Sequence, residues 1–192
     1  MDQMSVDICV NTDGQEISRY DRLHFAMIRI VHETLYGVFV NPYRLLTQAG
    51  LRRGQRVLEV GCGPGFFTIP AAKIAGETGR VIALDINPAA VEYVSRKIVG
   101  SGLANVETRL ADATETRLGD ESVDLAFLFG VMHSFKDLNK LLREMHRVLR
   151  PNGILSIQSR LAEKELLETV GATQLFKFRE ETKRVYVFER KL

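Results

Sequence analysis

An apolar run that leads into three closely spaced glycines constrains the fold of this 192-residue chain more than any other feature. The stretch from Val57 to Thr68 reads VLEVGCGPGFFT, so Gly61, Gly63 and Gly65 directly follow residues suited to a buried strand. A strand, a glycine turn and a helix in this order are typical of doubly wound sheets, which bind ligands at the carboxyl ends of their strands. The sequence therefore predicts an α/β fold with a ligand site at this loop.

From residue 55 onward, short β-branched runs alternate with helical patterns, which indicates βαβ units around a mostly parallel sheet. The expected strands are Arg56 to Val60, Arg80 to Asp85, Val106 to Ala111, Val123 to Phe129 and Ile154 to Gln158. The expected helices are Phe66 to Ala75, Ala89 to Val99, Leu138 to Leu149 and Glu163 to Val170. Pro151-Asn152-Gly153 should end the third helix, and the tail should form an antiparallel hairpin centred on residues 180–182.

The N-terminal part of the chain reads differently. Tyr20 to Val40 is rich in apolar residues but is interrupted by charges, so we expect one or two helices that end at Asn41-Pro42 rather than a membrane span. We divide the chain into an N-terminal helical lid or extension, residues 1–40, and one globular domain, residues 41–192. The alternatives for the extension are packing on the back of the sheet and contacts in a homodimer.

Composition excludes several classes of protein. The net charge is only +2 and the basic residues are scattered, which argues against a dedicated nucleic-acid binder. The two cysteines, Cys9 and Cys62, are far apart and give neither a disulfide framework nor metal-ligand spacing, which suits the cytoplasm. The N-terminus lacks the pattern of a signal peptide, and no run reaches the roughly 18 apolar residues of a membrane span.

The glycine loop favours a cationic ligand over a phosphate. Its spacing is one residue tighter than the G-x-G-x-x-G of dinucleotide sites, and the charge of Glu59 at the strand end would repel phosphate. Asp85 ends the next strand about 20 residues later, a position suited to ribose hydroxyls. Asp112 follows the third strand and could accept from an adenine amino group. S-adenosylmethionine has an ammonium group, a ribose and an adenine, and no phosphate.

Five segments in order resemble the motifs of class I S-adenosylmethionine-dependent methyltransferases. They read LEVGCGPG, VIALDI, RLADATE, SVDLAFLFGVMHSF and LLREMHRVLRPNGIL, and the match covers about residues 40 to 160. The resemblance is to the small-molecule branch that includes ubiquinone/menaquinone-biosynthesis-type enzymes. It implies a Rossmann-like, doubly wound, seven-stranded sheet, mostly parallel with one antiparallel strand, in a three-layer α/β/α arrangement.

The resemblance also implies which residues bind the cofactor. They are Glu59, Gly61, Cys62, Gly63, Gly65, Asp85, Ile86, Asp112, Ala113, Phe129 and Gly130. Glu59 and Gly61 would hold the methionine amino group, and Gly63 and Gly65 would let the backbone approach the ligand. The Cys62 side chain is expected to be a small loop filler and not a nucleophile.

The remaining roles follow the strand ends in order. Asp85 would bind both ribose hydroxyls, and Ile86 would flank the adenine. Asp112 would accept from the adenine amino group with Ala113 beside it. Phe129 to Val131 would line the methyl end of the cofactor.

His133 is the candidate catalytic residue, because it follows the fourth strand and its ordinary pKa suits removal of a proton from a substrate. The alternative is a structural residue next to Ser134. We expect a metal-independent enzyme that moves a methyl group in line to an O, N or C nucleophile of a small, partly apolar molecule and releases S-adenosylhomocysteine. The alternatives are an RNA or protein methyltransferase and a non-catalytic S-adenosylmethionine-binding regulatory module.

Overall fold

The computed structural model describes residues 22, 23, 25, 26, 29, 30, 40–159 and 163–192. The strands are β1 (Arg56–Val60), β2 (Arg80–Asp85), β3 (Val106–Leu110), β4 (Val123–Phe129), β5 (Leu149–Gln158), β6 (Phe176–Thr182) and β7 (Val185–Arg190). The helices are α3 (Pro42–Gln48), α4 (Thr68–Ala75), α5 (Pro88–Ser101), α6 (Leu138–Val148) and α7 (Glu163–Ala172), and η2 (Met132–Ser134) is a short 3-10 turn. Within these ranges, no helix is long and apolar enough to cross a membrane.

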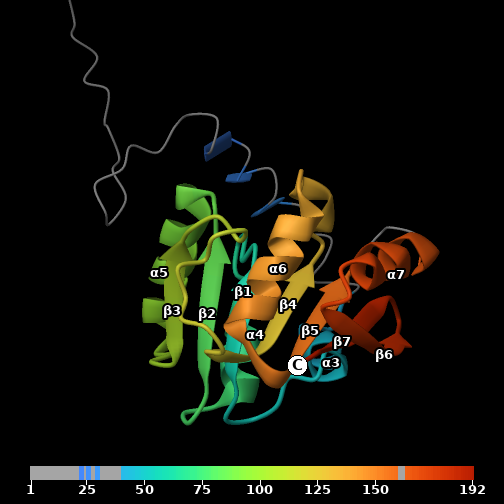
Figure 1. The fold of residues 1–192 in the computed structure, drawn as a ribbon. Coiled ribbons are helices and arrows are strands. Elements are labelled where there is room, and N and C mark those ends of the chain that lie inside the picture. The colour runs from blue at the N-terminus through green and yellow to red at the C-terminus, as the bar shows by residue number, and fades with distance from the viewer. Residues whose placement is uncertain (1–21, 24, 27–28, 31–39, 160–162) are drawn as a thin grey trace, which may run out of the picture.

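The strands form one seven-stranded sheet in the order β3-β2-β1-β4-β5-β7-β6 (Figure 1). Strands β1 to β5 pair in parallel, whereas β7 pairs antiparallel with both β5 and β6. β7 is therefore the strand that runs against the others. This arrangement confirms the predicted fold, a mostly parallel, doubly wound sheet with one antiparallel strand.

Helices cover both faces of the sheet (Figure 1). Leu141 and Met145 of α6 and Leu166 of α7 pack in one core cluster with one face of the central strands, including Leu58. The opposite cluster joins α3 and α4 to the other face, where Val57 points. Because the central parallel strands are covered on both sides, their sequences are almost continuously apolar. This explains why the sequence pattern located them correctly.

The winding of the chain reverses between β1 and β4. From β1 the chain moves outward to β2 and β3, and it then returns to place β4 on the other side of β1. The loops that follow β1 and β4 therefore leave the sheet in opposite directions, and in doubly wound sheets such a divergence places a crevice at the carboxyl ends of the two strands. This is where doubly wound sheets bind their ligands.

The start of β5 differs from the prediction. β5 begins at Leu149, which pairs with Val123, and the register is irregular before Leu125 pairs with Ile154. The helix ends within one residue of the expected position, at Val148, but the Pro151-Asn152-Gly153 segment that follows lies inside β5 and not in a loop. Asn152 has a φ of 63°, which bends the strand locally.

Two other boundaries also differ. The hairpin turns at Lys183 and Arg184, which both have positive φ, and not at residues 180–182, which belong to β6. Asn41-Pro42 starts a helix and does not end one, because the Asn41 side chain accepts from the backbone N–H of Arg44 and caps α3. The helices expected over Tyr20 to Val40 lie mostly outside the described residues. The six that are described before residue 40 are helical.

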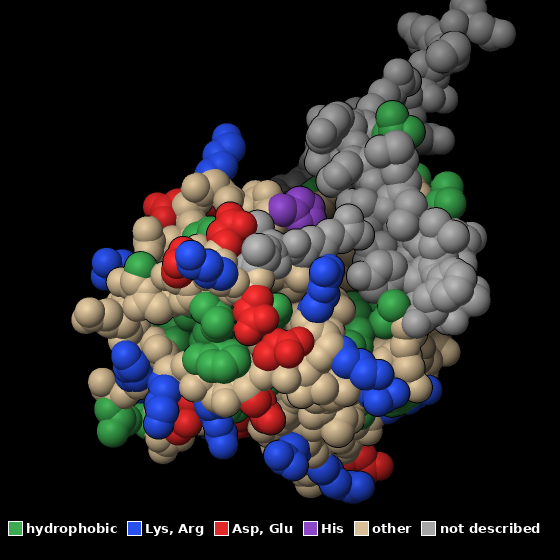
Figure 2. Space-filling view, turned by 90° about the vertical axis from the view of Figure 1, so that its right-hand side faces the viewer, with side chains coloured by type: hydrophobic (Ala, Val, Ile, Leu, Met, Phe, Trp, Pro, Cys, Tyr) green, Lys and Arg blue, Asp and Glu red, His purple; other side chains and the backbone are tan. Residues whose placement is uncertain are grey.

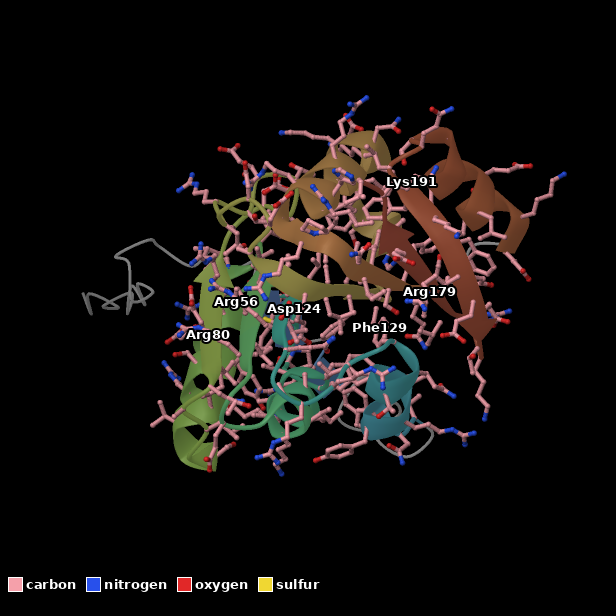
Figure 3. The ribbon with its side chains drawn as sticks, turned by 60° about the horizontal axis from the view of Figure 1, so that its bottom comes forward. Arg56, Arg80, Asp124, Phe129, Arg179 and Lys191 are labelled. Atoms are coloured by element: carbon pink, nitrogen blue, oxygen red, sulfur yellow. The ribbon has the colours of Figure 1, made fainter. Side chains whose placement is uncertain are left out.

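At the amino ends of the strands, one carboxylate joins three neighbouring strands. Asp124 Oδ2 accepts from the backbone N–H of Arg56 at 2.7 Å, and Asp124 Oδ1 accepts from Arg150 Nη1 at 2.6 Å. Figure 3 shows Arg56 and Asp124 side by side at this edge, with Arg80 of β2 next to them. Asp124 thus ties β4 to β1 and to β5 at the end of the sheet opposite the crevice.

We expect Asp124→Ala to lower the free energy of unfolding by about 1–3 kcal/mol, because a partly buried N–H and a guanidinium both lose their acceptor. The matched control is Asp120→Ala, which removes an ion pair with Arg147 whose acidic side chain is 76% exposed and should change stability by about 1 kcal/mol or less. Urea unfolding of both variants measures the difference. Equal losses would show that Asp124 does not join the strands.

Candidate functional site

The three glycines of the loop have different surroundings. All three have positive φ, 75° at Gly61, 49° at Gly63 and 76° at Gly65. A Cβ on Gly61 would lie 2.5 Å from Val131 Cγ1, and a Cβ on Gly65 would lie 3.1 Å from Val94 Cγ2. A Cβ on Gly63 would meet nothing within 4 Å. Gly61 and Gly65 therefore permit close packing, whereas Gly63 leaves bare backbone facing open space.

Cys62 connects the loop to β2. Its backbone N–H and that of Gly61 both donate to the carbonyl of Leu84, at 3.0 and 2.8 Å, which joins the loop to β2. The Cys62 side chain is buried in a small cluster with Ala83 and Val94. Burial, followed by the nearby carboxylates, raises the pKa of the thiol well above its ordinary value. The thiol therefore stays protonated and acts as packing.

Glu59 is a buried carboxyl group at the base of the crevice. It is only 2% exposed, and its Oε2 accepts from the Thr68 hydroxyl at 2.6 Å. Burial raises the pKa of Glu59 from 4.5 to about 8, the Thr68 hydrogen bond opposes the rise, and the charge of Asp85 adds to it. A carboxylate held in this way favours a positively charged partner, because such a partner would stabilise the ionised form.

Asp85 closes the neighbouring strand and holds the top of the loop. Its Oδ2 accepts from the backbone N–H of Gly63 and its Oδ1 from that of Asn87, both at 2.9 Å. The Asn87 side chain in turn accepts from Ala89 N–H and caps α5. The carboxylate is therefore oriented by two loops at once.

The residues beside Asp85 form a partly apolar surface. Ile86 is 70% exposed, which is unusual for a large aliphatic side chain. Asp112 follows the end of β3, the strand next to β2, and is exposed. Its Oδ1 accepts from the backbone N–H of Thr114 at 2.7 Å, and the neighbouring Ala113 is buried. An exposed isoleucine near an acceptor carboxylate fits a flat heterocycle such as adenine.

The end of β4 forms the opposite wall of the crevice. Phe129 is buried, and its ring lies 5.1 Å from those of both Phe67 and Phe127. Gly130 is exposed, with a φ of 71°, and its N–H donates to Gln158 at 3.1 Å. His133 is exposed in η2. The structure thus brings Val131, which follows β4, against Gly61, which follows β1, and places His133 on the exposed turn η2 two residues later.

These residues fit S-adenosylmethionine better than a nucleotide phosphate. The carboxylate of Asp85 would repel an anion, and an anion would also disfavour ionisation of Glu59, whereas a cation would favour it. The open backbone of Gly63 offers room for a close approach. In the part of the chain that the structure describes, no three His, Cys, Asp or Glu side chains are grouped to hold a metal ion.

A hollow of about 450 Å³ lies away from this crevice, at the amino ends of the strands. It is lined by Asp120, Glu121, His146, Arg147 and Arg190. Arg147 pairs with Asp120 at 2.5 Å, and Arg190 pairs with Glu121 at 3.0 Å. Because both arginines are neutralised by acids of the same hollow, we assign it to the packing of the C-terminal strand and not to ligand binding.

Comparison with known proteins decides the family. A family model described as "Methyltransferase domain" matches residues 51–189. The chain belongs to this methyltransferase family. The ubiquinone/menaquinone biosynthesis C-methyltransferase of Escherichia coli O1:K1 / APEC is 34% identical over 156 residues, which are 81% of this chain and 60% of that protein. The resemblance to class I S-adenosylmethionine-dependent methyltransferases is therefore confirmed.

Solved structures agree with the fold. A SAM dependent methyltransferase from Aquifex aeolicus superposes with a TM-score of 0.76 and 26% identity, covering 86% of this chain and 97% of the other. The [4+2]-cyclase SpnF superposes with a TM-score of 0.65 at 21% identity over 72% of this chain and 57% of its own, and this likeness shows the fold alone. The chain spans between 44% and 60% of the length of the curated relatives that it matches.

Sequence reasoning missed Thr68 and Lys97. The Thr68 hydroxyl binds Glu59 and is fully buried, and Lys97 Nζ donates to the Pro64 carbonyl at 3.1 Å. A buried threonine at the first turn of α4 gives a weak signal, because threonine is also common at helix starts. The signal for Lys97 is weaker still, since exposed lysines are the rule on helices. Both contacts depend on the packing of a helix against the loop.

The free energy of unfolding should fall from pH 5 to 8 in the wild-type protein relative to Glu59→Gln. The folded state binds the Glu59 proton more tightly than the unfolded state does. The folded state therefore loses stability as the pH rises from the unfolded pKa near 4.5 to the folded pKa of about 8. The limiting slope is about 1.4 kcal/mol per pH unit. Urea unfolding across this range measures it.

Thr68→Val provides the second arm of this test. It keeps the shape of the side chain and removes the hydrogen bond that favours the carboxylate, so the fall should extend to higher pH than in the wild type. A difference between wild type and Glu59→Gln that does not change with pH would contradict the assignment.

Proposed function

We propose that this chain is a small-molecule methyltransferase that uses S-adenosylmethionine. The observation that carries the proposal is a set of two acids at neighbouring strand ends: the buried Glu59, and Asp85, which raises its pKa further and accepts from the backbone N–H of Gly63. A Cβ on Gly63 would meet nothing within 4 Å, and the winding of the doubly wound sheet reverses at this point. Membership of the methyltransferase family and the Aquifex aeolicus structure support it.

Each strand end would hold one part of the cofactor. Glu59 at the end of β1 would accept from the ammonium group, and Asp85 at the end of β2 from the ribose hydroxyls. The exposed Ile86 would lie against the adenine, and Asp112 would accept from its amino group. Phe129 and Gly130 would line the methyl end.

Bound S-adenosylmethionine supplies an electrophilic methyl group on a sulfonium and leaves as S-adenosylhomocysteine. The chain's own residues then have three tasks: to hold the methyl donor in line with the nucleophile, to exclude water, and to take a proton where the acceptor has one to lose. The buried aromatic cluster that includes Phe67 and Phe129 at the end of β4 supports the exclusion of water. His133 is our candidate for the proton acceptor, because it is exposed beyond the end of β4.

The acceptor is proposed to be a small, partly apolar molecule. The relative from Escherichia coli is a ubiquinone/menaquinone biosynthesis C-methyltransferase by name, so an aromatic carbon nucleophile is the first class to test. An RNA acceptor is disfavoured by the mixed charges of the described surface. Figure 2 shows Lys and Arg interspersed with Asp and Glu on the side that carries α7 and β6. A cytoplasmic location and a homodimer stay predictions.

Residues 1–40 are proposed to form a lid over the acceptor side. Of the described residues in this part, Phe25 is buried and its ring lies 5.3 Å from that of Tyr93 on α5. This contact supports packing near the carboxyl ends of the strands, because the Lys97 side chain on the same face of α5 reaches the glycine loop. The division at residues 40 and 41 stays part of the proposal.

Asp85→Asn should weaken S-adenosylmethionine binding about 10- to 100-fold, because hydrogen bonds to a charged acceptor become bonds to a neutral one. Isothermal titration calorimetry of the full chain measures the change. The control is Asp120→Asn, which alters an exposed carboxylate at the amino ends of the strands. If the wild type bound NAD more tightly than S-adenosylmethionine, the proposed function would be wrong.

A variant that begins at Asn41 tests the lid. It should fold and still bind S-adenosylmethionine, with an affinity lowered at most as much as in Phe25→Ala. At saturating S-adenosylmethionine it should lose about tenfold or more in kcat/KM for the acceptor found in a tritium-methyl transfer screen, since the acceptor would no longer be positioned or shielded from water. Circular dichroism and thermal melting monitor folding. A truncated variant that kept both its cofactor affinity and its transfer rate would rule out the lid.

A further inference from the structure

One turn of α5 contacts the glycine loop through two side chains. Lys97 Nζ donates to the carbonyl oxygen of Pro64 at 3.1 Å. Val94, which is fully buried, fills the space beneath Gly65, where a Cβ would come within 3.1 Å of its Cγ2. The carbonyl of Pro64 lies between the open Gly63 and the packed Gly65. The lysine therefore holds the loop at the point where bare backbone faces the crevice.

The same turn of α5 receives the N-terminal part of the chain. The Phe25 ring lies 5.3 Å from the Tyr93 ring at an interplanar angle of 57°, and Phe25 is only 7% exposed. The guanidinium of Arg29 lies 5.5 Å from the centre of the Tyr93 ring. A half-buried tyrosine on a surface helix is thus covered by two residues far from it in the sequence.

Lys97 links the two contacts. Its Nζ lies 5.7 Å from the centre of the Tyr93 ring while it also donates to Pro64. A cation over an aromatic ring is attracted to the face of that ring, so Tyr93 restricts the positions that the lysine side chain can adopt. Covering Tyr93 with Phe25 also removes water from the neighbourhood of this interaction and strengthens it.

We propose that Lys97 is a positioning residue for the cofactor loop, and that Tyr93 couples the N-terminal residues Phe25 and Arg29 to it. Lys97 acts through the Pro64 carbonyl and does not itself touch the cofactor. The arrangement orders the backbone at Gly63 before the ligand arrives, which lowers the cost of ordering the loop on binding. The inference rests on the proposed S-adenosylmethionine site.

The first test removes the charge of Lys97 and keeps its aliphatic stem. Lys97→Met should weaken S-adenosylmethionine binding by about three- to tenfold in calorimetry, as expected for the loss of one hydrogen bond that orders the loop. Lys97→Arg keeps the charge and the donors and should restore most of the affinity. Lys164→Met is the matched control, because Lys164 lies on α7, at the opposite edge of the sheet, with an 86% exposed side chain.

A second readout needs no cofactor. Amide hydrogen exchange of Gly63 and of residues 65–67 should be faster in ligand-free Lys97→Met than in the wild type, because the loop loses its hydrogen bond to α5. The thermal midpoint should stay close to that of the Lys164→Met control. If Lys97 had a purely structural role, the thermal midpoint would fall in both Lys97→Met and Lys97→Arg, and Lys97→Arg would not recover the affinity for S-adenosylmethionine.

The coupling to the N-terminal residues is tested by a double-mutant cycle. Phe25→Ala should weaken cofactor binding in the wild-type background and have a smaller effect in Lys97→Met, since the route through Lys97 is already lost. Additive effects would overturn the coupling through Tyr93. If Lys97→Met bound S-adenosylmethionine as tightly as Lys164→Met, the positioning role would be wrong while the proposed function stood. A wild-type protein that failed to bind S-adenosylmethionine would remove both.

Discussion

The pairing of β1 with β4 is the constraint on which the site depends. The two strands run in register from Val57 opposite Leu125 to Val60 opposite Leu128, and both are buried on their two faces. Their loops leave in opposite directions, so the crevice between them is a consequence of the winding and not of any single side chain. Gly61 allows Val131 to pack against the loop at the top of this pair. A larger residue there would push the two walls of the crevice apart.

The same end of the sheet holds a buried ionisable group, Glu59, that the fold alone does not need. Glu59 is buried at the end of β1, close enough to Asp85 for the second carboxylate to raise its pKa further. Burying a carboxyl group with one hydroxyl partner is costly, and an apolar residue would pack at less cost. The unliganded protein tolerates Glu59 because the group holds its proton near neutral pH. A cationic ligand would replace that proton, which gives the residue a role in binding that packing cannot explain.

Much of the fold could be predicted because the central strands are buried on both faces. Runs such as that from Val123 to Phe129 are almost entirely apolar on both faces and are therefore recognisable as buried strands. The order of strand, glycine loop and helix indicated the direction of winding. Boundaries were predicted less well where the backbone departs from regular geometry. The Pro-Asn-Gly run around Asn152 indicated a turn, but not that a strand continues through it. The turn at Lys183-Arg184 uses positive φ in two residues that give no clear sequence signal.

The candidate site could be predicted in part for a related reason. Its acids lie at strand ends, so their positions follow directly from the strand assignment. The groups that orient the site, Thr68 and Lys97, come from helices and act across the packing between a helix and the loop. Which helical side chain reaches the loop depends on the rotation of the helix about its axis. A single sequence constrains that rotation only through the apolar face of the helix, and that face does not specify its polar neighbours.

The likeness to a protein named as a [4+2]-cyclase shows that this fold alone does not decide the reaction. The proposed cofactor site uses the ends of the central strands, which any chain of this fold must form. An acceptor is best recognised by parts that can vary without disturbing the sheet, and the N-terminal residues that pack on Tyr93 are the part that we propose for this role. If those residues also steady the loop through Lys97, recognition of the acceptor and binding of the cofactor are not independent. Divergence of the N-terminal segment would then change both the choice of acceptor and the affinity for the methyl donor.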